Sequence, residues 1–381
     1  MALGIFEQLA WLTTRVKRLC CAVDKNTTAI AELVAETAAN TAAIAAAAVA
    51  NPCYLEIVWD DIANAGLVNL ADYNSLITFY GPPINFTALV TVGNTQRLYG
   101  GGNIVLNGDF FNYQSDHVVS INDACGAIKL IGDGVFINNS ILSYVNFPKA
   151  IVIYNEAFLN CTSLTFINFP EVIEIYDAAL SNTLIGTASF PKLPYVATNT
   201  FKNCYSLISI DFPIATYLDD SAFESCSSLT TISLPKVQVI ESICFYGCTN
   251  LSEFTAVNLE TIGNNAFQNN SNLLVINALK VLNIGSGAFS SCTVLPSVNF
   301  PLLTSIDKRA FENCTSLTSI DTPSLINLGG TPGNDYVFDG ITGLTINLTV
   351  PIAQSTIDSG NPDGDIVFLL TNNPSSTVNY I

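Results

Sequence analysis

Residues 157–170 read AFLNCTSLTFINFP, and this stretch decides the fold because the same pattern returns along the chain. Phe158 is the anchor of the pattern, with Cys161 at position +3, Leu164 at +6, Ile167 at +9 and a Phe-Pro pair at +11 and +12. Nine such anchors follow one another at intervals of 22 residues, with a single interval of 21: Phe136, Phe158, Leu180, Phe201, Phe223, Phe245, Phe267, Phe289 and Phe311. Self-similarity at a fixed period of this length predicts a solenoid of stacked repeats.

Apolar residues return at the same positions of each repeat, which predicts one shared core. Position −5 is Ile, Val or Leu throughout, and position +6 is Leu in every repeat except one, which has Gly186 and the 21-residue interval. A single repeat is too small to bury its apolar side chains, whereas stacked repeats bury each one against its copies. The alternation at +9 and +11 predicts a short strand with an apolar inward face. The anchor is expected on the opposite side of the coil, after a turn or short helical segment.

Position +3 is cysteine in six repeats, while Asn139, Thr183 and Asn270 occupy the other three. One interpretation is a ladder of metal-binding or redox-active thiols. The replacement by Asn and Thr favours the other, a small and weakly polar side chain that fills a tight bend. The total of 11 cysteines is odd, so buried free thiols are expected instead of a disulfide framework, which suits synthesis in a reducing cytoplasm.

The pattern A-F-x-x-C-x-x-L-x-x-I-x-F-P resembles the BspA-like leucine-rich repeat family, which occurs in bacterial surface proteins and in some phage proteins. The resemblance covers residues 131–323, about half of the chain. It implies a right-handed solenoid used for adhesion and for binding proteins or glycans. Binding residues differ between members of the family, so the resemblance assigns none to this chain.

Residues 1–50 follow the alternating three- and four-residue spacing of a coiled coil. A break near Asp24 separates a first seam, expected as a docking collar, from an Ala- and Thr-rich stalk. The seam residues are Ile5, Leu9, Leu12, Val16, Leu19, Val23, Ile30, Val34, Thr37, Thr41 and Ile44. The run N-T-A-A-I-A-A-A-A resembles the trimeric coiled coils of phage fibres, which favours a homotrimer. A single amphipathic helix packed on the solenoid is the alternative.

The predicted fold class is therefore mainly β, a leucine-rich-repeat solenoid of nine 22-residue rungs with β-rich caps, preceded by an N-terminal α-helical coiled coil. Caps are expected because the terminal rungs of a solenoid would otherwise expose their core. The predicted segments are a virion-docking collar helix at 1–23, the stalk at 24–52, an N-terminal cap at 53–130, the solenoid at 131–323 and a C-terminal cap at 324–381.

Charge and hydropathy exclude two classes of partner. The net charge of −18 repels phosphate backbones, so binding to nucleic acid is not expected. No uninterrupted apolar stretch reaches about 18 residues, so insertion into a membrane is not expected. The basic residues Arg15, Lys17 and Arg18 follow the first apolar stretch instead of preceding it, so no cleaved signal peptide is expected.

Patterns that carry catalysis or bind metals are few. His117 is the only histidine, which excludes a His-based metal cluster and favours a surface or cap role for this residue. Asp358, Asp363 and Asp365 could chelate calcium, but their spacing does not match an EF-hand loop, and a solvated turn is favoured. We therefore predict no catalytic residues, no cofactor and no resident metal.

The best candidates for ligand binding are aromatic residues at outward positions of adjacent repeats. They form three pairs: Tyr144 and Phe166 at +8, Tyr154 and Tyr176 at −4, and Tyr195 and Tyr217 at −6. Stacked repeats would bring the two members of each pair side by side, a platform suited to sugar rings or to a protein partner. Ordinary packing at the surface is the alternative interpretation.

The favoured function is a head or tail fibre of a bacteriophage virion, made in the host cytoplasm. In this hypothesis the N-terminus of the homotrimer docks on a capsid or tail protein, and the solenoid binds a glycan or protein of the host surface. A bacterial cell-surface leucine-rich-repeat adhesin is one alternative, although it would normally need a leader or a sorting tail. A capsid decoration protein without receptor binding is another. A depolymerase would need clustered carboxylates on one face, where the outward positions hold mostly Ser, Thr and Asn.

Overall fold

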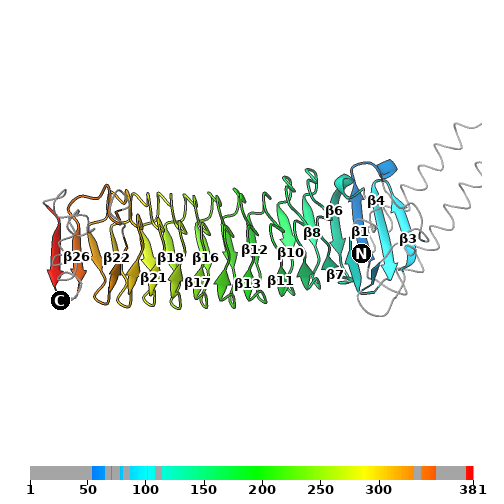
Figure 1. The fold of residues 1–381 in the computed structure, drawn as a ribbon. Coiled ribbons are helices and arrows are strands. Elements are labelled where there is room, and N and C mark those ends of the chain that lie inside the picture. The colour runs from blue at the N-terminus through cyan, green and yellow to red at the C-terminus, as the bar shows by residue number, and fades with distance from the viewer. Residues whose placement is uncertain are drawn as a thin grey trace, which may run out of the picture.

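The computed structural model describes residues 54–64, 70, 78–79, 86–100, 102–107, 114–329, 336–348 and 375–380. Their coils stack along one axis and form an elongated solenoid (Figure 1). The predicted coiled-coil seams between Ile5 and Ile44 lie outside the described residues, as do Asp358, Asp363 and Asp365. The hypotheses about these residues stay predictions.

Most coils contribute two short strands, and these line up in two parallel rows. The first row, at positions equivalent to +8 to +10, is β8 (Tyr144–Asn146), β10 (Phe166–Asn168), β12 (Thr187–Ser189), β14 (Ser209–Asp211), β16 (Thr231–Ser233), β18 (Glu253–Thr255), β20 (Val275–Asn277), β22 (Ser297–Asn299), β24 (Ser319–Asp321) and β26 (Thr345–Leu348). The second row, at −6 and −5, is β9 (Val152–Ile153), β11 (Glu174–Ile175), β13 (Tyr195–Val196), β15 (Tyr217–Leu218), β17 (Val239–Ile240), β19 (Thr261–Ile262), β21 (Asn283–Ile284), β23 (Ser305–Ile306) and β25 (Asn327–Leu328). The predicted strand at +9 is confirmed, whereas the second row was not predicted.

An antiparallel sheet covers the N-terminal end of the solenoid. Its strands are β1 (Tyr54–Trp59), β3 (Phe86–Val92), β4 (Thr95–Gly100) and β6 (Val118–Asp123). Because β6 pairs antiparallel with β1 and parallel with β8, the cap continues the first row of strands. The second row is extended in the same way by β2 (Thr78–Phe79), β5 (Ile104–Leu106) and β7 (Ile128–Ile131), and two short 3-10 helices, η1 (Ile62–Asn64) and η3 (Ser115–His117), complete the described part of the cap. The buried side chains of Ile57 and Ile121 belong to the same core as those of the first repeat, which water therefore does not reach.

The anchor residues form a ladder of stacked rings inside the solenoid. From Phe201 to Phe311, each ring centroid lies 5.2–5.4 Å from the next, and neighbouring planes differ by at most 13°. Phe136 and Phe158 stack in the same way at 5.3 Å, and Leu180 interrupts the ladder. Every anchor is fully buried. Each aromatic contact adds about 0.5–1.5 kcal/mol to the stabilisation by burial.

The predicted turn around each anchor is confirmed, and residues with left-handed backbone lie on both sides of the anchor. Position +2 is Asn, Ser or Gly in all nine repeats, for example Asn160 with φ 61° and Gly247 with φ 69°. These residue types tolerate positive φ at little steric cost. Position −2 also has positive φ, and in one repeat it is the β-branched Ile243 with φ 62°, a strained conformation.

The repeat with the 21-residue interval keeps its core column. Thr187 pairs with Ser209, which aligns Ile185 with Leu207. Ile185 is fully buried, so Ile185 occupies the place of the leucine at +6, and the assignment of Gly186 to that place was wrong. The missing residue is therefore lost from the turn between the anchor Leu180 and Ile185, where a shorter connection leaves the core intact.

The cysteine column consists of buried hydrogen-bond donors. Cys248 Sγ donates to the carbonyl oxygen of Phe223 at 3.2 Å, and five other cysteines make the equivalent bond at 3.0–3.3 Å to the anchor of the preceding repeat: Cys161, Cys204, Cys226, Cys292 and Cys314. Asn270 Nδ2 replaces the thiol and donates to Phe245 O at 2.8 Å. Burial raises the pKa of the Cys161 thiol to about 12, so the thiol keeps its proton. The bend-filling interpretation fits these contacts, and the structure adds the donor role.

Solenoid order continues beyond the ninth anchor. The ring of Phe338 stacks on Phe311 at 6.1 Å, and β26 pairs in parallel with β24. A further strand, β27 (Thr377–Tyr380), pairs in parallel with β26. The start of the segment expected as a C-terminal cap therefore adds strands to both rows. In the described part of the chain, no helix has the length and hydropathy needed to cross a membrane.

Candidate ligand-binding surfaces

Four tyrosines lie on the outward face of the second row of strands, one in each of four successive repeats. Tyr154 and Tyr176 directly follow β9 and β11, and Tyr195 and Tyr217 begin β13 and β15. Positions −6 and −4 face the same side because they are two residues apart in an extended chain. We call this set the tyrosine row. The rings of Tyr154 and Tyr176 stack at 5.3 Å with planes 10° apart, and those of Tyr195 and Tyr217 at 5.3 Å with planes 19° apart.

Carboxylates accompany the tyrosine row. The hydroxyl of Tyr217 donates to Glu241 Oε1 at 2.5 Å, and that of Tyr195 donates to Asp219. Burial, together with the hydrogen bond to a carboxylate, raises the pKa of both phenols. The phenols therefore stay protonated and act as donors that hold the carboxylates beside the rings. The row thus offers aromatic faces and hydrogen-bond acceptors together.

The tyrosine row is accessible and preformed. Tyr176 and Tyr195 are 40% and 39% exposed. In later repeats the same positions carry small or polar residues, among them Thr261, Gly263 and Asn283. The aromatic surface is therefore confined to the early repeats, as the sequence predicted.

Tyr144 and Phe166 form a second, separate aromatic surface on the first row of strands. Their rings are 4.6 Å apart with planes 5° apart, and Phe166 is 45% exposed. The prediction that each pair lies side by side is confirmed for all three pairs. The six predicted residues do not form one surface, because β8 and β10 belong to a different sheet from β9 and β11, while β13 and β15 belong to a third.

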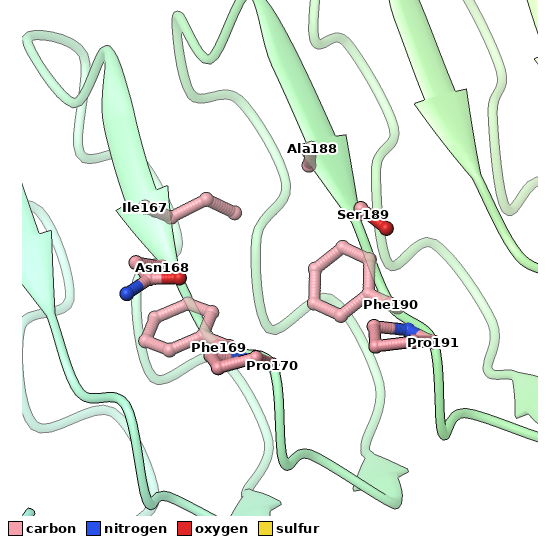
Figure 2. Close-up of a pocket in the computed structure, with 8 residues that line it drawn as sticks. All are labelled: Ile167, Asn168, Phe169, Pro170, Ala188, Ser189, Phe190 and Pro191. Atoms are coloured by element: carbon pink, nitrogen blue, oxygen red, sulfur yellow. The ribbon is translucent and has the colours of Figure 1, made fainter.

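A pocket next to Phe166 was not predicted from the sequence. The sheet of the first row ends at β10 and a new sheet begins at β12. Between these two strands lies an open pocket of about 170 Å³, lined by Ile167, Asn168, Phe169, Pro170, Ala188, Ser189, Phe190 and Pro191 (Figure 2). Ala188 stands in a column that otherwise holds Ile, Val or Phe from Val145 to Ile346, and its small side chain leaves the space open. Ala188, in the repeat with the 21-residue interval, was the feature of the sequence that could have indicated the pocket.

The described residues with titratable side chains show no constellation for catalysis. His117 Nδ1 lies 2.9 Å from Asp60 Oδ2, and this hydrogen bond raises the pKa of His117. Both side chains are about one-third exposed, so the pair connects η3 to the end of β1 at the surface of the cap. No group of three or more His, Cys, Asp or Glu that could hold a metal ion occurs within the described ranges. That the protein is not an enzyme stays a prediction.

Comparison with known proteins identifies the repeat. The family described as "BspA type Leucine rich repeat region (6 copies)" matches residues 129–252 and 216–345. No curated protein matches the chain. Similar solved structures include a leucine-rich repeat protein from Bacteroides ovatus, with 21% identity over 77% of this chain and 91% of that one and a TM-score of 0.34.

Two further solved structures are similar to this chain. One is a leucine-rich repeat protein of T. pallidum, with 24% identity over 46% of this chain and 83% of that one and a TM-score of 0.37. The other is a leucine-rich cell surface protein of Faecalibacterium prausnitzii, with 21% identity over 65% and 87% of the two chains and a TM-score of 0.32. The match to the family extends over more than half of the sequence, between residues 129 and 345. The chain therefore belongs to the BspA-type leucine-rich repeat family.

Proposed function

We propose that this protein is a non-catalytic recognition protein of the bacterial cell surface, an adhesin that binds glycans through the tyrosine row. The observation that carries the proposal is two stacked tyrosine pairs in four successive repeats, with carboxylates bonded to the hydroxyls of Tyr195 and Tyr217. The resemblance to the repeat family, whose members serve in adhesion, supports it. The phage fibre remains a second candidate.

The chemistry of the tyrosine row suits a sugar ligand. Exposed tyrosine faces present apolar area on which the C–H faces of sugar rings can stack, and the phenol keeps a polar edge. Carboxylates such as Glu241 accept hydrogen bonds from sugar hydroxyls, and these charge-assisted bonds are among the strong ones. The net charge of −18 disfavours polyanionic ligands, so a neutral glycan is the expected partner.

The solenoid keeps the tyrosine row in place before a ligand arrives. Tyr154 and Tyr217 lie beside or in strands that are paired on both sides, β9 and β15, whereas β11 at Tyr176 and β13 at Tyr195 are each paired on one side. A preformed surface loses little conformational entropy when it binds, which favours affinity. The same rigidity spaces the binding groups by one repeat along the axis, which matches a polymeric ligand that offers similar groups at regular intervals.

We expect the double variant Tyr195→Ala with Tyr217→Ala to lose glycan binding by about 10- to 100-fold, because both stacking faces disappear. Glycans that bind the unaltered protein would first be found on an array, and dissociation constants would then be measured by calorimetry. The matched control changes Thr261→Ala and Asn283→Ala, which occupy the same −6 position in later repeats. Unchanged affinity in the tyrosine variant would contradict the proposal.

The phage fibre is favoured by a different observation, the heptad seams in residues 1–48. If those seams form a coiled coil, we expect the full chain to be a trimer by light scattering. Val34→Asp would dissociate it because a charge enters the seam, whereas Ala35→Asp outside the seam would not. A monomeric full chain would remove the physical support for a fibre. A trimer that binds virions and no glycan would favour the capsid decoration protein.

A further inference from the structure

The pocket lies between β10 and β12, where the parallel ladder of the first row is interrupted. In the neighbouring coils, the residue after the strand donates its N–H to the next strand, as Phe147 does to Asn168 O at 3.1 Å and Phe190 to Asp211 O at 2.9 Å. No equivalent bond joins Phe169 to Ser189 among the described residues. Within the part of the chain that the structure describes, the N–H of Phe169 has no backbone acceptor, and by analogy with Phe147 and Phe190 it is directed towards the gap.

An acceptor accompanies this donor. Asn168 Nδ2 donates to Asn146 Oδ1 at 2.7 Å, as the last step of an asparagine ladder that begins at Asn122. Figure 2 shows the side-chain oxygen of Asn168 on the side of β12, away from the preceding strand. In β12 the ladder position is Ser189, whose hydroxyl bonds to Asp211 instead. The Asn168 oxygen thus faces the gap as an available acceptor.

The walls of the pocket are apolar. Ile167 and Phe169 contribute one side, and Ala188 and Phe190 the other (Figure 2). An apolar cavity of about 150 Å³ is large enough to take up benzene, so a pocket of about 170 Å³ accommodates a methyl group with its attached amide. At the two other breaks of the first row, the equivalent positions carry Phe254 and Val298, which are buried and fill the space that Ala188 leaves open.

An aromatic face adjoins the pocket. Tyr144 of β8 covers one face of the Phe166 ring, so the other face looks towards β12, where the equivalent residue is the small Thr187. Phe166 and Asn168 point to the same side of β10 and are roughly 6–7 Å apart along the strand. That separation matches a sugar ring with a substituent on the neighbouring carbon.

We propose that the gap between β10 and β12 is a subsite for the acetamido group of an N-acetylated sugar whose ring stacks on Phe166. The acetamido carbonyl accepts a hydrogen bond from the Phe169 N–H, and the acetamido N–H donates to Asn168 Oδ1. The methyl group enters the apolar pocket beside Ala188. A free amino sugar would bring an ammonium group to apolar walls and leave the Phe169 N–H without an acceptor, so the subsite selects against it. The inference rests on the proposed glycan recognition and names its ligand class.

The test is a titration of the full chain with di-N-acetylchitobiose and, separately, with chitobiose that lacks the acetyl groups. Dissociation constants and the backbone amide signal of Phe169 are followed by nuclear magnetic resonance. We expect at least 10-fold tighter binding of the acetylated sugar and a shift of the Phe169 signal with that sugar alone. Ala188→Ile should abolish the difference. This variant should fold, because Ile210 and Ile232 occupy the same column in the next coils. Val298→Ile, which adds a methylene group to that column far from the pocket, is the control.

Equal binding of the two sugars, or a preference that survives Ala188→Ile, would overturn the subsite. An equal shift of the Phe169 signal with N-acetylalanine methylamide would overturn the sugar assignment in favour of a peptide. The subsite and the proposed function fail in different ways. If the tyrosine double variant loses binding to the array, but the unaltered protein binds the two chitobioses equally, only the subsite is wrong. If acetylated chitobiose binds tightly and this binding depends on Ala188, but the tyrosine double variant keeps its affinity for glycans, only the role of the tyrosine row is wrong.

Discussion

Phe245→Ala is expected to destabilise the protein by about 3–5 kcal/mol, the usual range for a buried phenylalanine truncated to alanine. The ring of Phe245 is fully buried and stacks on Phe223 at 5.2 Å and on Phe267 at 5.3 Å. Phe254 packs against it at 5.4 Å. The second row of strands, which is paired without interruption from β15 to β21, keeps the neighbouring coils from collapsing into the cavity. Unfolding in urea, followed by circular dichroism, measures the loss.

Phe166→Ala is the matched control for this prediction. It removes the same number of atoms from a ring that is 45% exposed, so a loss below about 1 kcal/mol is expected. Hydrogen exchange should show lowered protection in the coils next to Phe245 and not in distant coils, because each repeat contacts only its neighbours. Equal losses in the two variants would show that the anchor ladder does not stabilise the solenoid.

The second large effect is expected from replacing Cys248 by Asn or by Asp, two residues that have nearly the same shape as each other. Cys248→Asn should cost about 1–2 kcal/mol, because the amide can donate to Phe223 O as Asn270 does to Phe245 O, while its oxygen lacks a partner. Cys248→Asp should cost about 4 kcal/mol or more at neutral pH, because a buried carboxylate would face a carbonyl oxygen without a donor. Denaturant titrations of the two variants give the difference.

The aspartate variant should also depend on pH in a defined direction. Burial raises the pKa of this carboxyl above its value of about 3.9 in the unfolded chain. The protonated form can donate to Phe223 O, so the missing stability is restored below about pH 4 and lost as the pH rises through the folded pKa. The asparagine variant has no such titration. If both variants show the same pH profile, the donor role of the cysteine column is wrong.

The core of the solenoid was predictable because repetition makes its contacts local. Once residue i is buried against residue i+22, the buried positions of Phe158, Leu164 and Ile167 predict the equivalent buried positions in all the remaining coils. Side-by-side placement of Tyr144 with Phe166, and of the two tyrosine pairs, followed from the same argument. The second row of strands was missed because its two-residue strands are too short to show an alternation.

The pocket was not predictable, because it depends on the loss of strand pairing and of side-chain volume between two coils. The sequence shows that Ala188 replaces a larger residue and that one repeat is a residue shorter. It does not show that the ladder between β10 and β12 opens, since the row is also interrupted between β16 and β18 and between β20 and β22, where no repeat is shortened. A small residue in a column leaves an open space only if the side chains of the adjacent coils do not move in to fill it.

By itself, the sequence determined the period, the inward columns and the outward aromatic columns of this protein, because a 22-residue repeat converts spacing along the chain into contact between coils. Only the tertiary structure decided which outward columns share a face. It places positions −4 and −6 on the same face of the second row of strands, and Tyr144 and Phe166 on the first row. It also decided where the ladder of hydrogen bonds is interrupted. The reason is physical: periodicity defines neighbours within a column, whereas relations between columns and gaps between coils depend on how each turn folds and how closely the coils pack.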